Sequence, residues 1–313
     1  MSTASSVPVT REEELEGDEA LQTLRRTGRR RLALDAVSRF RAADGFSHSR
    51  ALAFQTTLTI LPALIAIVGL AAALEVESFT RVVRATIEQI APGTIGEIFT
   101  DALRQGTSAV RQESGEVALV GGAIAAALAG TTAMAQVERG ANRICGTEKD
   151  RPFVRKYLNG ALLAASAGSL AGLSLVVLVG GSAIRDNVGW GDTIDDVWVV
   201  ARWPIGITLA IAAIALLFEH APRRRQPEAS WLAFGAATST LLWLSFMAVL
   251  VVYVEATGSL GATYGPVAGT IGVLLWTFLS AVALFLGLAF AAQLEAVRAG
   301  VSAPRVERDE HRP

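Results

Sequence analysis

The chain is poor in the residues that form disulfides, metal sites and catalytic pairs. Cys145 is its only cysteine, which excludes an intramolecular disulfide. Its three histidines, His48, His220 and His311, lie far apart, and no pair has the spacing of zinc ligands. Clustered carboxylates for metal-dependent hydrolysis and an evident acid and base pair are also missing. We therefore expect no enzyme, no metal and no cofactor.

The first 24 residues lack the apolar segment that a cleavable signal peptide requires, and they contain an acidic run from Glu12 to Glu19. Their polar composition predicts a disordered tail over residues 1–24. The formal net charge of −1 says little about partners, because the acidic and basic residues are separated along the chain.

Long apolar stretches, in contrast, are abundant. Six of them in 313 residues leave too little polar surface to wrap a soluble core, so each predicts a membrane span. The spans run over about 51–74, 117–137, 161–184, 197–218, 231–254 and 266–294. Backbone amides in hydrocarbon need internal partners, which predicts helices. The fold class is therefore all-α, a polytopic membrane domain over residues 51–297 with six transmembrane helices.

Basic residues alternate from loop to loop, and the basic loops face the cytoplasm in bacterial membranes. The basic side is formed by the segment before the first span, the loops after the second and fourth spans, and the tail over 298–313. The opposite loops hold few arginines and collect acids such as Asp195. Both termini are predicted to be cytoplasmic, with the first span acting as the insertion signal.

Two regions outside the spans have helical patterns. Within residues 25–50, one face repeats apolar residues beside many arginines: Ala33, Ala36, Val37, Phe40 and Ala43. This pattern fits an amphipathic helix on an anionic leaflet, or equally a helix packed on the cytoplasmic ends of the bundle. The outer loop over 75–116 has two apolar stripes separated by Pro92 and Gly93, which predicts two short helices.

Small residues are frequent inside the spans. Gly168 and Gly172 form one GxxxG pair, and Gly265 and Gly269 form another. Such pairs let helices pack closely where no hydrophobic effect drives them together. The sequence leaves open whether the bundle is a monomer or a homo-oligomer. The second and sixth spans share an ending of Gln, aliphatic and Glu, at 136–138 and 293–295, without a convincing repeat.

Polar residues inside the spans are the candidate functional residues, because burying them is costly unless they meet a partner or water. They form two stripes at helical spacing, on the first and second spans: Gln55, Thr59, Pro62, Thr132, Gln136, Arg139, Asn142 and Arg143. If both stripes face inward, they line one polar pathway open to the cytoplasm. Alternatively, the Thr and Gln side chains join helices and the arginines extend to the headgroups.

Four segments resemble the YihY/BrkB family of bacterial inner-membrane proteins, historically mislabelled ribonuclease BN. They are ALAFQTTLTILPALIAI, AMAQVERGANRI, RPFVRKYLNGALLA and YGPVAGTIGVLLWTFLSAVALFLG, and the likeness extends in order from about Arg29 to Val297. The Pro and Arg loop of the family is matched by APRRR at residues 221–225.

The resemblance implies a six-helix inner-membrane protein that acts as a transporter, including of lipid, or in envelope integrity. Its partners would be membrane lipids and an anionic lipid or small solute, with no nucleic acid. Gly287 to Ala291 stand where relatives tend to have a Glu and an Asn, which removes an intramembrane carboxylate and argues against proton coupling. A scaffold without transport is the alternative function, and a ribonuclease is the least expected.

Overall fold

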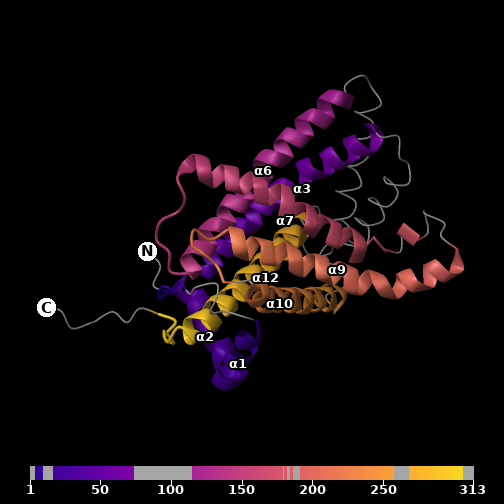
Figure 1. The fold of residues 1–313 in the computed structure, drawn as a ribbon. Coiled ribbons are helices and arrows are strands. Elements are labelled where there is room, and N and C mark those ends of the chain that lie inside the picture. Colours follow the sequence, from indigo (N-terminus) through magenta and orange to yellow (C-terminus); the bar gives the residue numbers. More distant parts are fainter. Residues whose placement is uncertain are drawn as a thin grey trace.

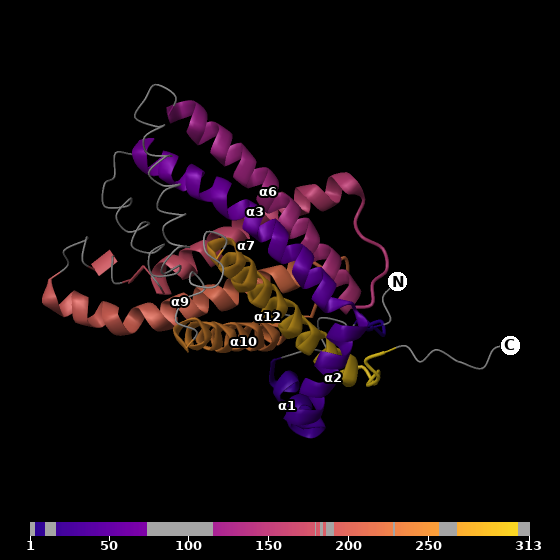
Figure 2. The same cartoon turned by 180° about the vertical axis from the view of Figure 1, so that it is seen from behind.

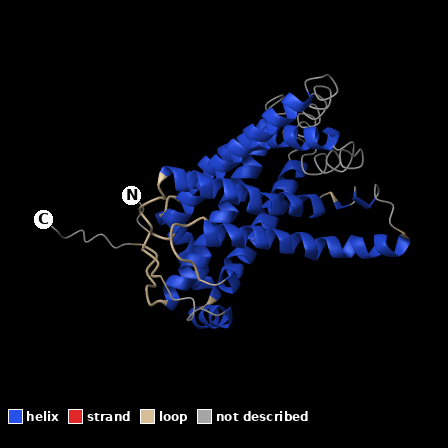
Figure 3. Ribbon diagram, turned by 45° about the horizontal axis from the view of Figure 1, so that its top comes forward, coloured by secondary structure: helices blue, strands red, loops and turns tan. Residues whose placement is uncertain are grey.

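The computed structural model describes residues 4–9, 17–73, 115–178, 180–181, 184–185, 191–227, 229–256 and 268–305. The regular structure of this part is helical, apart from one isolated antiparallel bridge between Ala4 and Arg305 (Figure 3). Two short helices come first, α1 (Gly17–Thr27) and α2 (Arg29–Ala42). The all-α prediction is therefore confirmed for the described residues.

Six long helices follow, and each contains most of one predicted span. They are α3 (Gly45–Ala73), α6 (Gly115–Ile144), α7 (Phe153–Leu178), α9 (Asp192–His220), α10 (Ala229–Ala256) and α12 (Ala268–Arg298). Five of them, α6 to α12, hold segments long and apolar enough to cross a membrane. The crossing of the membrane by α3 and the orientation of the termini stay predictions. The two helices expected over residues 75–116 also stay a prediction, because residues 74–114 lie outside the described part of the chain.

The six long helices pack pairwise in a closed order: α3, α6, α7, α9, α10, α12 and back to α3 (Figure 1). Across this ring, α6 also touches α12, where the Phe285 ring lies against Gly140. Phe285 belongs to the buried core that fills the ring, together with Val137, Ala289 and Phe218. The ring is thus solid at this level rather than hollow.

Glycines set the closest approaches between neighbouring helices. A Cβ on Gly122 would lie 2.8 Å from a side-chain atom of Ile65, which joins α6 to α3, and Gly235 on α10 faces Ala291 and Gly287 on α12. For Gly168 and Gly172, the predicted GxxxG pair, no atom of the described residues lies within 4 Å of such a Cβ. Close packing therefore uses other glycines than this pair.

The described ends of the chain meet at one end of the ring, with α1 and α2 beside them (Figure 2). α2 packs on α12 and buries Leu32, Ala36 and Phe40, whereas Val37 is exposed. Of the two predictions for α2, the structure supports packing on the bundle. A leaflet contact for its exposed face stays a prediction.

Disorder over the whole of residues 1–24 is wrong for the residues that the structure describes. Residues 17–24 belong to α1, where Ala20 is buried with Trp231 and Leu294. Ala4 and Val7 are buried in the main core. Composition predicts disorder here because the segment is polar and acidic overall, whereas its few apolar residues are buried against distant parts of the chain.

Candidate functional site

Charged side chains gather at the end of the ring where the termini meet. We call this set the ionic clasp, and its members come from α2, α6, α7, α12 and the loops between the helices: Arg39, Glu138, Asn142, Asp150, Arg151, Lys156, Arg224, Gln293 and Glu295. Buried charges are tolerated only when they are paired and hydrogen-bonded.

Glu138 lies near the end of α6 and is 1% exposed. Arg151, in the following loop, donates from Nη1 to its Oε2 at 2.9 Å and from its backbone amide to Oε1 at 3.0 Å. The same guanidinium donates to the carbonyls of His220, Ala221 and Pro222. One arginine therefore fastens the α6 end to the end of α9 and the loop after it.

Asn142 is fully buried one turn further along α6. Its amide donates to Asp150 at 2.9 Å, and its carbonyl oxygen accepts from the backbone amide of Arg223 at 2.7 Å. Asp150 also accepts from Lys156 at 2.8 Å. Burial alone would raise the pKa of Asp150, but the hydrogen bonds from Lys156 and Asn142 outweigh it and lower that pKa.

Arg224 forms the second buried ion pair, with Glu295 of α12. It also donates to the Pro8 carbonyl at 3.4 Å, so the pair includes the N-terminal segment. Burial would lower the pKa of Arg224, but its interactions with Cys145 and then with Glu295 more than offset this, and the pKa is raised. The pair therefore joins the loop after α9 to α12.

Arg39 of α2 is fully buried. It donates from Nε to Gln293 at 2.8 Å, and its Nη atoms donate to the backbone oxygen and the hydroxyl of Ser5 and to the Ile144 carbonyl. Burial lowers the pKa of Arg39 to about 10, which still leaves it charged at neutral pH. Arg39 thus joins α2, α6, α12 and the N-terminal segment.

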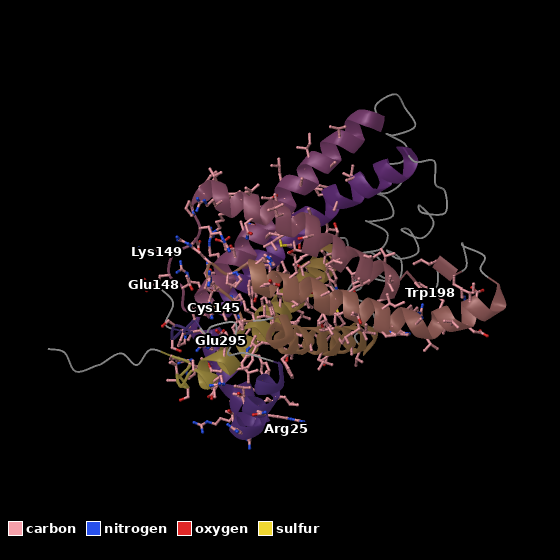
Figure 4. All side chains as sticks on the ribbon, viewed as in Figure 1. Arg25, Cys145, Glu148, Lys149, Trp198 and Glu295 are labelled. Carbon is pink, nitrogen blue, oxygen red and sulfur yellow. The ribbon has the colours of Figure 1, made fainter. Side chains whose placement is uncertain are left out.

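Cys145 is buried and lies near Glu295 at the clasp end in Figure 4. Burial raises the pKa of its thiol, against the opposing charge of Arg224. Its carbonyl accepts from the Val7 amide at 3.1 Å. Gly146, with φ of 72°, allows close passage of residue 6, because a Cβ there would lie 2.5 Å from the Ser6 Cα.

The predicted polar residues meet the clasp at the seam between α3 and α6. Gln136 is buried, and its Nε2 lies 3.2 Å from His48 Nδ1 on α3. Arg139, with a half-exposed side chain, donates to Gln136 at 3.4 Å and lies 3.7 Å from Asp150. Burial lowers the pKa of His48, and the nearby charges of Arg143 and Arg139 add to this.

Further along the seam, the two threonines of the predicted stripes bond to their own helices. Thr59 donates to the Gln55 carbonyl and Thr132 to the Ala129 carbonyl. The side-chain oxygen Oε1 of Gln55 is buried without a hydrogen-bond partner. Pro62 is half-buried within α3, one turn beyond Thr59. Arg143 donates to the Glu148 carbonyl, at the clasp end.

The structure therefore brings Gln136, Arg139, Asn142 and Arg143 close to the clasp, and leaves Gln55, Thr59, Thr132 and Pro62 deeper in the seam. Sequence reasoning did not predict the buried pairs of the clasp. The sequence feature that indicates these pairs is the ending of Gln, aliphatic residue and Glu that two spans share. The glutamate of each ending forms an ion pair with an arginine from a loop.

The carboxylates of the clasp do not resemble a hydrolytic centre. Among the described residues, no three of the His, Cys, Asp and Glu side chains lie close enough together to hold a metal ion. Glu138 is saturated by Arg151, and His220 is exposed, with Nδ1 3.9 Å from Glu219. The geometry fits a structural or gating role for these charges.

Comparison with known proteins agrees with the membrane architecture. The family described as Virulence factor BrkB matches residues 36–311. The chain is similar to the ribonuclease-like protein YfkH of Bacillus subtilis (strain 168), at 27% identity over 257 residues, 81% of this chain and 91% of that protein. No solved structure matches.

Proposed function

Because the chain belongs to the Virulence factor BrkB family and carries five helices fit to cross a membrane, we propose that it moves a lipid or an anionic solute across the bacterial inner membrane and thereby supports envelope integrity. Both termini would face the cytoplasm, so the ionic clasp would close the cytoplasmic end of the ring. The pathway would follow the seam between α3 and α6.

The observation that carries this proposal is the unpartnered oxygen of Gln55. A carbonyl oxygen buried without a partner costs free energy, and at membrane depth it is retained where water or a polar ligand meets it. Gln55 lies on α3 two turns beyond His48, which contacts the buried Gln136. The seam thus offers a polar group just beyond the clasp.

The clasp would serve as the gate of this pathway. Its two buried ion pairs and the Arg39 contacts connect α2, α6, α9, α12 and the N-terminal segment. Buried charges are stable only while they are paired, so opening this end of the ring would require these contacts to break. A closure of this kind suits a gate that a substrate opens.

Proteoliposomes containing a labelled anionic phospholipid test the proposal, with movement between leaflets followed by chemical quenching of the outer label. Gln55→Leu should slow movement about five- to tenfold, the scale of one lost hydrogen bond of about 1 kcal/mol. Ser245→Ala is the control, since that exposed hydroxyl bonds only to the Leu241 carbonyl of its own helix. No movement above empty liposomes by the folded protein would refute lipid translocation.

A scaffold without transport remains the second candidate, and one observation favours it. The hydroxyls of Thr59 and Thr132 are satisfied within their own helices, as expected of residues that only pack. Under this function Gln55→Leu changes nothing but expression. The ribonuclease-like name of the Bacillus relative gains no support here, because the Glu138 carboxylate is occupied by Arg151 and Asp150 by Lys156 and Asn142.

A further inference from the structure

The far end of α9, opposite the clasp, carries an arginine within a predicted span. In the six long helices every other Lys or Arg lies within two turns of the clasp end, whereas Arg202 lies 18 residues before His220. At 1.5 Å per residue, that is about 27 Å along α9. Figure 4 shows nearby Trp198 far from Cys145 and Glu295. Ionisable residues at membrane depth are functional candidates by default.

The surroundings of Arg202 hold its side chain in place but do not satisfy it. Its guanidinium carbon lies 5.5 Å from the centre of the Trp203 ring. Its stem passes Gly181, where a Cβ would lie 2.7 Å from the Arg202 Cδ, and Trp198 donates to the Gly181 carbonyl at 2.8 Å. Nε of Arg202 is buried without a hydrogen-bond partner. A positioned guanidinium with an unused donor is a site for an anionic oxygen.

Asp195 provides the complementary charge on the same face of α9. It precedes Arg202 by seven residues, which is nearly two helical turns and about 10 Å. One of its carboxylate oxygens, Oδ1, is also buried without a hydrogen-bond partner. The two side chains form no ion pair with each other among the contacts described. One face of α9 therefore carries an arginine and an aspartate, both half-buried and each with one buried polar atom that has no hydrogen-bond partner among the described residues.

The depths of the two residues match the layers of a bilayer. The hydrocarbon core is about 30 Å thick, and about 40–45 Å with the headgroups. With His220 at the clasp-side boundary, Arg202 at about 27 Å lies just inside the far boundary of the core, and Asp195 at about 38 Å lies in the headgroup layer. A phospholipid places its phosphate near that boundary and a headgroup amine at or beyond it.

We propose that Arg202 and Asp195 form a binding site for a glycerophospholipid headgroup that carries an ammonium group, with the phosphate on Arg202 and the ammonium beside Asp195. The Trp203 ring flanks the phosphate contact, as aromatic side chains do at membrane interfaces. The inference requires only that α9 crosses a membrane. It deepens the proposed function by naming the lipid class that enters or leaves the ring at this end.

Native mass spectrometry of the purified full-length protein tests the site with three lipids of equal chain length, carrying ethanolamine, glycerol or a bare phosphate as headgroup. Arg202→Gln should weaken the binding of all three about tenfold, the scale of a charge-assisted hydrogen bond. Asp195→Asn should weaken only the ethanolamine lipid. Arg185→Gln is the matched control, because Arg185 is an exposed arginine at the same end.

If Arg202→Gln and Arg185→Gln weaken lipid binding equally, the lipids are attracted by surface charge alone, and the proposed site is wrong. Unchanged binding in Arg202→Gln would overturn it as well, as would displacement of the lipids by millimolar inorganic phosphate, which would indicate a site for free anions. If Arg202→Gln does not fold, Arg202→Lys keeps the charge without the planar fork and should bind more weakly than the unaltered chain. Binding of the ethanolamine lipid at Arg202 without movement of the same lipid between the leaflets of liposomes would keep this inference and refute lipid translocation.

Discussion

Arg151→Ala should destabilise the protein more than the same substitution of the exposed Arg155 at the start of α7. The change leaves the Glu138 carboxylate buried without its partner, and it removes the donors to the carbonyls of Ala221, His220 and Pro222. Breaking a buried ion pair from one side costs about 3–5 kcal/mol. For a chain of this size, that corresponds to a fall in Tm of about 10 °C.

Cys145 makes this measurement direct, because it is the only cysteine and is buried beside the clasp. A thiol-reactive fluorogenic dye should label it only when the clasp opens, so a thermal ramp in detergent reports the opening of this region. Arg155→Ala is the matched control: Arg155 is an exposed arginine four residues further along. The Arg155 variant should label at the temperature of the unaltered chain.

A double-mutant cycle separates the ion pair from the other contacts of Arg151. Glu138→Gln removes the stranded charge, so the double variant should be more stable than the sum of the two single effects predicts, by about 1–3 kcal/mol. A Tm of Arg151→Ala within about 1 °C of Arg155→Ala would refute the idea that the pair holds this end of the ring closed.

The other predictions concern pH and packing. Burial lowers the pKa of His48 below 6.5, so the folded state favours the neutral imidazole. The contribution of His48 to the free energy of unfolding is therefore complete above pH 6.5 and is lost as the pH falls through the pKa of the folded state. In a series of Tm measurements from pH 7.5 to 5, the fall in Tm should be smaller for His48→Asn than for the unaltered chain. Burial raises the pKa of Cys145 above 9.0, so the contribution of the neutral thiol to the free energy of unfolding is complete below pH 9 and is lost as the pH rises further. The Tm of Cys145→Ala should therefore fall less at alkaline pH than the Tm of the unaltered chain. Gly287→Val should cost about 1–3 kcal/mol, because a Cβ there collides with Ser239 of α10, whereas Gly168→Val should leave the Tm of the monomer unchanged.

The candidate stripes show how far sequence reasoning reached at the site. Helical spacing placed Gln55 and Gln136 in polar stripes on two spans and left open whether the stripes face each other; α3 and α6 do pack together, with Gln136 contacting His48. The spacing did not distinguish Gln136, which has partners, from Gln55, whose oxygen has none. Whether a polar side chain is satisfied depends on atoms from another helix, and a sequence does not show these.

The roles of individual arginines were also only partly predicted from the sequence. The arginines at 223–225 were explained by topology alone, yet Arg224 is buried against Glu295 of α12. Arg202 was overlooked, because its span has the average hydropathy of a lipid-facing helix despite one charge. Hydropathy averaged over a span does not reveal a single charged side chain such as Arg202. The free-energy cost of burying that side chain depends on the groups around it.

The sequence by itself determined the helical class, the approximate lengths of the long helices and the family. These follow from local properties: apolar length fixes the span, and backbone amides in hydrocarbon must bond within their own helix. Only the tertiary structure decided the closed order of the six helices, the packing of residues 4–9 against Cys145, and the pairing of Glu138 with Arg151. These contacts join residues far apart in the chain or on different elements, so they depend on helix packing and burial rather than on composition or spacing.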